Sequence, residues 1–112
     1  MWIITNNAFV SIVEHRDDAG MLIVRGRFKG DVARFLNPLP SGIGVIEECT
    51  PGADYRFRAT VPRDAVLHAM MRAGDRIRYP NFKDSIRAGW RKALAMRVWS
   101  MFHAAQHERA SQ

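Results

Sequence analysis

Two stretches of the chain alternate between apolar and polar residues, and this period of two constrains the fold more than any other feature. The first is MLIVRGRFK, residues 21–29, and the second is YRFRATV, residues 55–61. Successive side chains of a strand point to opposite faces, so this pattern predicts strands that bury one face. Residues 9–16, FVSIVEHR, are rich in β-branched residues, and the turn sequence DDAG joins them to residues 21–29 in a predicted hairpin.

A short helix is predicted directly after this hairpin. Gly30-Asp31 opens it, with Asp31 as the expected N-cap. Three apolar residues at helical spacing are expected to face the core: Val32, Phe35 and Leu36. The prolines within residues 37–42 end the helix, because proline lacks an N–H group and clashes with the preceding turn.

Two later helical segments are predicted from their caps. Residues 63–73 follow Pro62, which suits a first helical turn, and carry Leu67, Met70 and Met71 on one face before the expected cap Gly74. In the stretch RYPNFKDSI, Asn81 is the expected N-cap of the second segment, and Asp84 complements its dipole.

The last helix is predicted over residues 90–106, after a break at Gly89. Its apolar residues form one stripe: Leu94, Val98, Met101, Phe102 and Ala105. A third strand is expected over residues 43–49, which gives the element order ββαββαα. This order predicts an α+β fold in which two hairpins make a four-stranded antiparallel sheet with helices packed on one face. Residues 1–112 are predicted to form a single domain, in which residues 106–112 fray.

Several classes of protein are disfavoured by composition. The sequence has one cysteine, Cys49, and no apolar run of the roughly 18 residues that a membrane helix needs, which favours a cytoplasmic protein without a membrane partner. No phosphate loop or catalytic motif of known type is present, so no enzyme activity and no cofactor are predicted. His103 and His107 share a helix face but lack an evident third ligand, so no metal site is predicted.

Positive charge is concentrated in one segment of the chain. The net charge is +6, and residues 72–97 carry eight basic residues against Asp75 and Asp84 only. Such an excess favours an acidic partner, either nucleic acid or an acidic protein surface. A solvated, non-functional surface is the competing interpretation.

The first candidate binding surface lies on the C-terminal helical segment. Lys83, Arg87 and Arg91 are spaced i, i+4 and i+8, and would line one face of an uninterrupted helix, with Lys92 beside them. Such a row suits a phosphate backbone. A break at Gly89 would scatter it.

The second candidate surface is the open face of the sheet. Arg25, Arg27 and Lys29 on one strand and Arg56 and Arg58 on another are predicted to share this face. The alternation sends Phe28, Tyr55 and Phe57 inward, so a base-stacking platform is predicted to be missing. Pairing of these arginines with Glu47 or Glu48 is the structural alternative.

Five short motifs resemble a family of small uncharacterised bacterial and phage proteins. They are MWIITNNAFVSIVE, RGRFKGD, DYRFRATV, YPNFKDSI and VWSMF, and together they span residues 1–102. The family has no established activity, so the resemblance implies a shape and no chemistry.

These patterns predict a small, basic, non-enzymatic binding protein that contacts nucleic acid or a nucleoprotein complex. A second hypothesis is a protein-interaction module, for example a phage-type factor that blocks a host defence complex, and exposure of Trp2, Trp90 or Trp99 would favour it. The third is a self-associating structural protein, such as a homodimer formed through the sheet.

Overall fold

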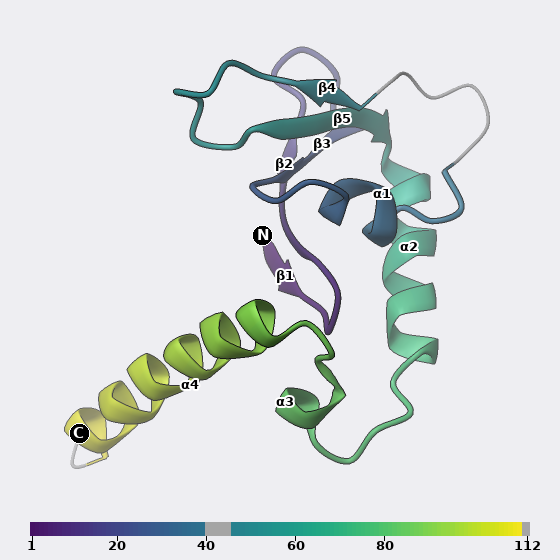
Figure 1. Cartoon of the computed structure of the whole chain (residues 1–112). Helices are drawn as coiled ribbons and strands as arrows, with labels where there is room; N and C mark the ends of the chain where they lie inside the picture. Colours follow the sequence, from purple (N-terminus) through teal and green to yellow (C-terminus); the bar gives the residue numbers. More distant parts are fainter. Residues whose placement is uncertain (40–45, 111–112) are drawn as a thin grey trace. The chain divides into compact units, whose positions relative to one another are not determined.

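The structure is a computed structural model that describes residues 1–39 and 46–110 (Figure 1). In chain order the elements are β1 (Trp2–Ile4), β2 (Phe9–Glu14), β3 (Met21–Gly26), α1 (Asp31–Phe35), β4 (Glu47–Glu48), β5 (Phe57–Pro62), α2 (Arg63–Asp75), α3 (Phe82–Ser85) and α4 (Gly89–Arg109). The predicted α+β class is confirmed. The chain divides into two compact units, Met1–Arg78 and Tyr79–Gln112.

The N-terminal unit is built on one antiparallel sheet with the strand order β1-β2-β3-β5-β4. The predicted hairpin of β2 and β3 is present. The predicted four strands and the order ββαββαα are wrong, because the described residues contain five strands and four helices. The additional strand is β1, which pairs with β2 and is secured by a hydrogen bond from the Ile12 N–H to the Met1 carbonyl oxygen (2.8 Å).

The predicted strand over residues 43–49 is described only in part. Its observed portion, β4, comprises Glu47 and Glu48 and pairs with β5. Residues 43–45 lie outside the described part of the chain. Within the described residues, β4 is the shorter of the two edge strands.

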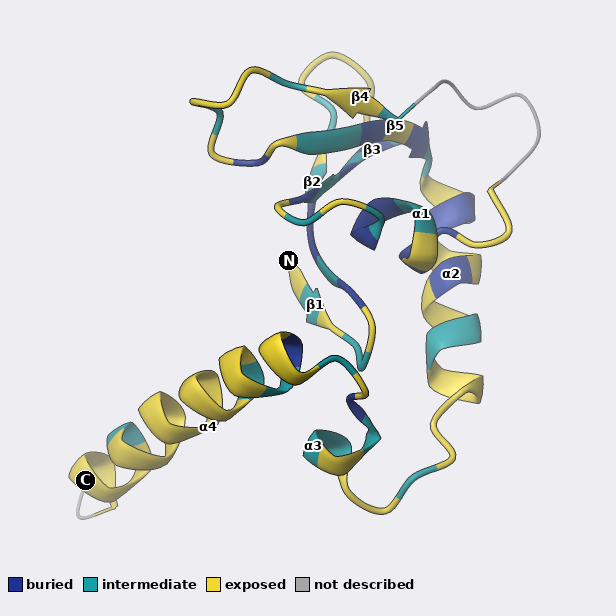
Figure 2. Cartoon of the chain, in the orientation of Figure 1, coloured by how far each residue is buried: buried dark blue, intermediate teal, exposed yellow. Residues whose placement is uncertain are grey.

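One face of the sheet forms the core together with α1 and α2 (Figures 1 and 2). The sheet contributes alternate residues such as Val10, Val24 and Val61, all of them fully buried. The helices contribute Val32, Phe35 and Leu36, as predicted, together with Val66. Alternation in the sequence therefore identified correctly which face of β3 and β5 is buried.

Helix α2 packs on the sheet through small residues rather than through its largest ones. Ala65, Val66 and Ala69 are buried, whereas Leu67 and Met71 are exposed. Small side chains allow a helix to approach a sheet closely. The predicted cap Gly74 is also wrong, because α2 continues to Asp75 and its C-cap is Arg76.

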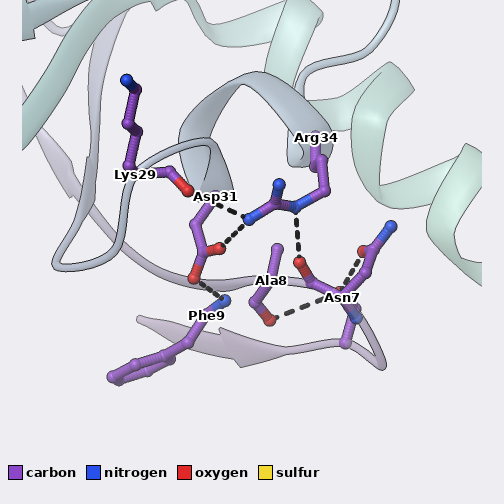
Figure 3. A network of polar contacts seen from close by, with 7 residues as sticks. Asn7, Ala8, Phe9, Lys29, Asp31 and Arg34 are labelled. Atoms are coloured by element: carbon purple, nitrogen blue, oxygen red, sulfur yellow. Dashed lines mark hydrogen bonds and ion pairs between the residues drawn. The ribbon is translucent and has the colours of Figure 1, made fainter. Parts of the chain in front are cut away.

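A buried carboxylate fixes the hairpin to α1 (Figure 3). Asp31 is fully buried, and its Oδ2 accepts a hydrogen bond from the Phe9 N–H at 2.9 Å. Its Oδ1 accepts one from Arg34, whose Nε donates to the Asn7 carbonyl oxygen at 2.8 Å. Asp31 is therefore not the N-cap that the sequence predicted. The N-cap is Gly30, at a φ of 90° that favours glycine, and a Cβ there would lie 2.6 Å from the Arg34 side chain.

The C-terminal unit begins with the helix start predicted in RYPNFKDSI. The Asn81 side chain accepts a hydrogen bond from the Asp84 N–H at 3.1 Å, so the predicted N-cap is confirmed. Helix α3 ends at Ser85, and α4 starts at Gly89 after an extended connection. Helix α4 has 21 residues and includes residues 106–109, which the sequence placed in a frayed tail.

Replacing Asp31 with alanine is expected to lower the free energy of unfolding of the chain. The variant leaves the Phe9 N–H and the Arg34 guanidinium without their acceptor, and such a loss typically costs roughly 2–4 kcal/mol. Urea denaturation followed by circular dichroism measures the change. Asp17→Ala removes an equal charge at an exposed turn position and is expected to stay within about 0.5 kcal/mol of the original chain. Equal losses in both variants would show that the buried carboxylate is not the anchor.

Candidate nucleic-acid interface

The sheet face opposite the core is lined by polar and basic side chains from three strands. Strand pairing sets Ser11 directly opposite Arg25, and Arg25 directly opposite Arg58. Directly opposed residues of an antiparallel pair point to the same side, so these three share one face. The sequence predicted this shared position for Arg25 and Arg58, and the observed register is consistent with it.

Tyr55 lies against the arginines of this face rather than in the core. Strand β5 begins only at Phe57, so the alternation that placed Tyr55 inward does not extend back to it. The centroid of its ring is 4.5 Å from the Arg25 guanidinium carbon and 4.1 Å from that of Arg27. The prediction that this face lacks aromatic rings is therefore wrong.

Two further rings stand beside Tyr55. Trp2 and Phe9 form an edge-to-face pair with centroids 5.6 Å apart, and the Arg27 guanidinium carbon is 5.9 Å from the Phe9 ring. Trp2 is 68% exposed and Phe9 is half-buried, whereas Tyr55 is only 5% exposed. These residues are called the arginine–aromatic cluster below: Trp2, Phe9, Ser11, Arg25, Arg27 and Tyr55. Its outermost ring, Trp2, is the one accessible to a partner.

Ser11 links the cluster internally. Its Oγ accepts a hydrogen bond from Arg25 Nη2 at 2.7 Å, and it is also hydrogen-bonded to the Tyr55 phenol. The hydrogen bond with Ser11 lowers the pKa of Tyr55 most strongly, burial opposes this shift, and the positive charge of Arg27 lowers the pKa further. The Ser11 hydroxyl, and after it the charge of Arg27, thus favour the ionised form of the Tyr55 phenol.

The other arginines predicted on the open sheet face differ in whether they form ion pairs with acidic residues. Arg27 forms an ion pair with Asp54 at 3.1 Å, and Arg56 forms one with Glu48 at 3.0 Å. Arg58 faces Glu47 across the strands, yet it makes no ion pair among the described residues. The predicted arginine–glutamate pairing therefore holds for Arg56 and leaves Arg58 beside Arg25.

The predicted row of C-terminal cations is not on one helix face. Lys83 belongs to α3, Arg87 lies in the connection, and Arg91 belongs to α4, so the break before Gly89 separates them. Lys83 Nζ is 4.6 Å from the Trp99 ring, and Arg91 stacks on Trp90 at the same distance.

Lys92, the fourth cation of that set, forms an ion pair with Asp84 at 3.4 Å. Lys92 thus joins α4 to α3, as Lys83 does through its contact with Trp99. Arg87 is exposed, and the described part of the chain offers it no ion pair. These four side chains add positive charge without forming the single row expected from their spacing.

No group of three histidine, cysteine, aspartate or glutamate side chains among residues 1–39 and 46–110 is arranged to hold a metal ion. His103 and His107 instead contact each other, with their Nε2 atoms 3.2 Å apart. None of the helices within these ranges combines the length and apolar character required to cross a bilayer.

Comparison with known proteins gives no match to a protein-family model, to a curated protein or to a solved structure. The family resemblance of the five motifs therefore stays a prediction.

Trp2, Phe9, Ser11 and Tyr55 were not among the predicted site residues. For two of them the sequence held a usable signal: in FVSIVE, the buried positions Val10 and Ile12 leave Phe9 and Ser11 on the opposite face. Tyr55 follows the turn residues PGAD, which indicated that strand alternation begins later.

Tyr55→Phe is expected to destabilise the folded chain more at high pH than at neutral pH. The pKa of Tyr55 is lower in the folded state than the value of about 10 for an unfolded chain, so ionisation favours the folded state. This contribution is complete above the unfolded pKa and is lost as pH falls through the folded pKa. Urea denaturation at several pH values between about 7 and 10 measures it. Ser11→Ala removes the main cause of the shift and is expected to reduce the pH dependence, whereas a pH-independent loss in Tyr55→Phe would contradict the assignment.

Proposed function

We propose that the N-terminal unit binds single-stranded nucleic acid through the arginine–aromatic cluster. The observation that carries this proposal is the exposed Trp2 ring, held by Phe9 beside Arg27 on the open face of the sheet. Sheets that bind single strands combine aromatic rings, on which bases stack, with cations that attract the phosphates.

The members of the cluster, and Arg58 beside Arg25, have different parts in this proposal. Trp2 offers an exposed surface for base stacking, and Arg27 and Arg58 offer charge for phosphates. Tyr55 is too buried to stack on a base, so its role is to support Arg25 and Arg27 from beneath. Such a surface reads the backbone and stacked bases, so little sequence preference is expected.

The energetics of this face also favour a binding role. Arg25 and Arg58 are directly opposed like charges, an arrangement that destabilises a sheet. Their Nε atoms are buried and find no acceptor among the described residues. A folded protein tolerates such local costs mainly where a function requires them.

The C-terminal unit adds a long-range attraction. From residue 79 onward the sequence has six basic residues against Asp84 and Glu108. Fields of this kind raise the rate of association with polyanions, and salt weakens them.

Exposed tryptophans favour a second candidate function, a protein-interaction module. Trp2, Trp90 and Trp99 are all exposed. Tryptophan is enriched among the residues that dominate protein interfaces. The two candidates are separable because Trp2 belongs to the sheet and Trp90 and Trp99 belong to α4.

Trp2→Ala is expected to weaken binding to labelled single-stranded oligonucleotides by about tenfold, because loss of one stacking ring typically costs about 1–3 kcal/mol. Fluorescence anisotropy at a series of salt concentrations measures the affinity. Trp99→Ala is the matched control, since it removes an exposed ring of the same type from α4. No binding at low salt, or equal losses in the two variants, would rule out the sheet face as the binding surface.

Arg27→Gln is expected to reduce the slope of log affinity against log salt concentration by about one, since one phosphate contact is lost. Arg16→Gln removes the same charge from the exposed turn after β2 and is expected to leave the slope nearly unchanged. Identical slopes for both variants would show that net charge, rather than this cluster, governs binding.

A further inference from the structure

Helix α4 presents an apolar stripe to solvent. The α4 stripe consists of Leu94, Val98, Met101, Phe102 and Ala105, and its four largest side chains are all exposed. Met101 and Phe102 are the most exposed, at 72% and 74%. Figure 2 shows that α4 is exposed along most of its length. Contiguous apolar surface of this kind marks an interaction site.

The spacing of the stripe indicates the shape of its partner. Leu94, Val98, Met101 and Ala105 follow one another at intervals of four, three and four residues. This is the spacing of the seam through which one helix packs along another. A second helix with the same repeat fits such a seam.

The charges around the stripe indicate the chemistry of that second helix. Helix α4 carries four basic residues and a single acid, Glu108. Arg97 borders the stripe and makes no ion pair among the described residues. A second copy of α4 would bring the same excess of positive charge and only one acid per helix, so an acidic helix is the better complement.

The distribution of residues around α4 argues against a membrane surface as the occupant. Helices that lie on membranes have a strongly polar, charged face opposite the apolar one. The side of α4 opposite the stripe instead carries Trp99 and Met96 beside Lys92 and His103. Lys92 is in addition engaged with Asp84.

We infer that the α4 stripe is the docking surface for an acidic amphipathic helix of a partner protein. The apolar residues of that helix would pack against Leu94, Val98 and Met101, and its carboxylates would meet Arg97. Contacts within the C-terminal unit hold α3 against α4, through Lys92 with Asp84 and Lys83 with Trp99, and leave the stripe exposed. This inference develops the protein-interaction candidate and is independent of nucleic-acid binding by the sheet.

The probe is a designed helical peptide with leucines at the same four–three repeat and glutamates flanking them. Its lysine-flanked version tests the charge requirement. Isothermal titration of the full chain is expected to give saturable binding of the acidic peptide, at least about tenfold tighter than that of the basic peptide. Equal affinities, or no saturable binding of the acidic peptide, would overturn the inference.

A matched pair of variants locates the contact. Met101→Glu places a charge within the stripe and is expected to weaken peptide binding by at least about tenfold. Ser100→Glu adds the same charge on the opposite side of α4 and is expected to change binding by less than about threefold. Equal effects of the two variants would contradict docking at the stripe.

Two parallel measurements distinguish the other occupants. Sedimentation equilibrium of the chain alone is expected to show a monomer, and a dimer that Met101→Glu dissociates would assign the stripe to self-association instead. In flotation with phosphatidylserine vesicles, the chain is expected not to bind through the stripe. Vesicle binding that is lost in Met101→Glu would instead assign the stripe to a lipid surface. Oligonucleotide binding by Met101→Glu is expected to remain unchanged, so failure of this inference is distinct from failure of the proposed function.

Discussion

The carboxylate of Asp31 is the contact on which the rest of the N-terminal unit depends. It is fully buried, and it joins the start of β2 to the first turn of α1 through the Phe9 N–H and the Arg34 guanidinium. A buried charge is tolerated only when its hydrogen bonds are complete, so this network specifies one position of α1 on the sheet. Gly30 is part of the same constraint, because a side chain there would collide with Arg34.

This constraint also sets the position of the candidate interface. The Asp31 carboxylate binds the backbone of Phe9, whose ring contributes to the arginine–aromatic cluster on the other side of the sheet. At the start of β2, the backbone of Phe9 is thus bound to the buried carboxylate, while its side chain lies on the open face of the sheet. The proposed single-strand binding and the stability of the fold are coupled through this residue.

Each of the two compact units carries one candidate binding surface, and the two surfaces differ in chemistry. The sheet face combines cations with aromatic rings, which suits bases and phosphates. The α4 stripe combines an apolar seam with the bordering cation Arg97, on which the proposed docking of an acidic helix rests. The two proposed binding activities therefore belong to different units and are tested by different variants.

Sequence periodicity was most reliable where a single local rule decided the outcome. Alternation identified the buried faces of β3 and β5, and the pattern Asn81 to Asp84 identified the start of α3. It failed where two local rules conflicted. Tyr55 fits the alternation of β5 in the sequence, but the strand begins only at Phe57, after Tyr55. Leu67 has the helical spacing of a core residue, but α2 packs on the sheet through smaller residues such as Ala65 and Ala69.

The sequence by itself determined the α+β class, the central hairpin, the basic character and the shared face of Arg25 and Arg58, because these depend on side-chain alternation and composition. Only the tertiary structure decided that Asp31 anchors the fold and that Trp2, Phe9 and Tyr55 gather around two arginines. These contacts join residues as many as 53 positions apart in the chain, from Trp2 to Tyr55. No local pattern encodes such a distance, since it depends on which strands pair and in which register.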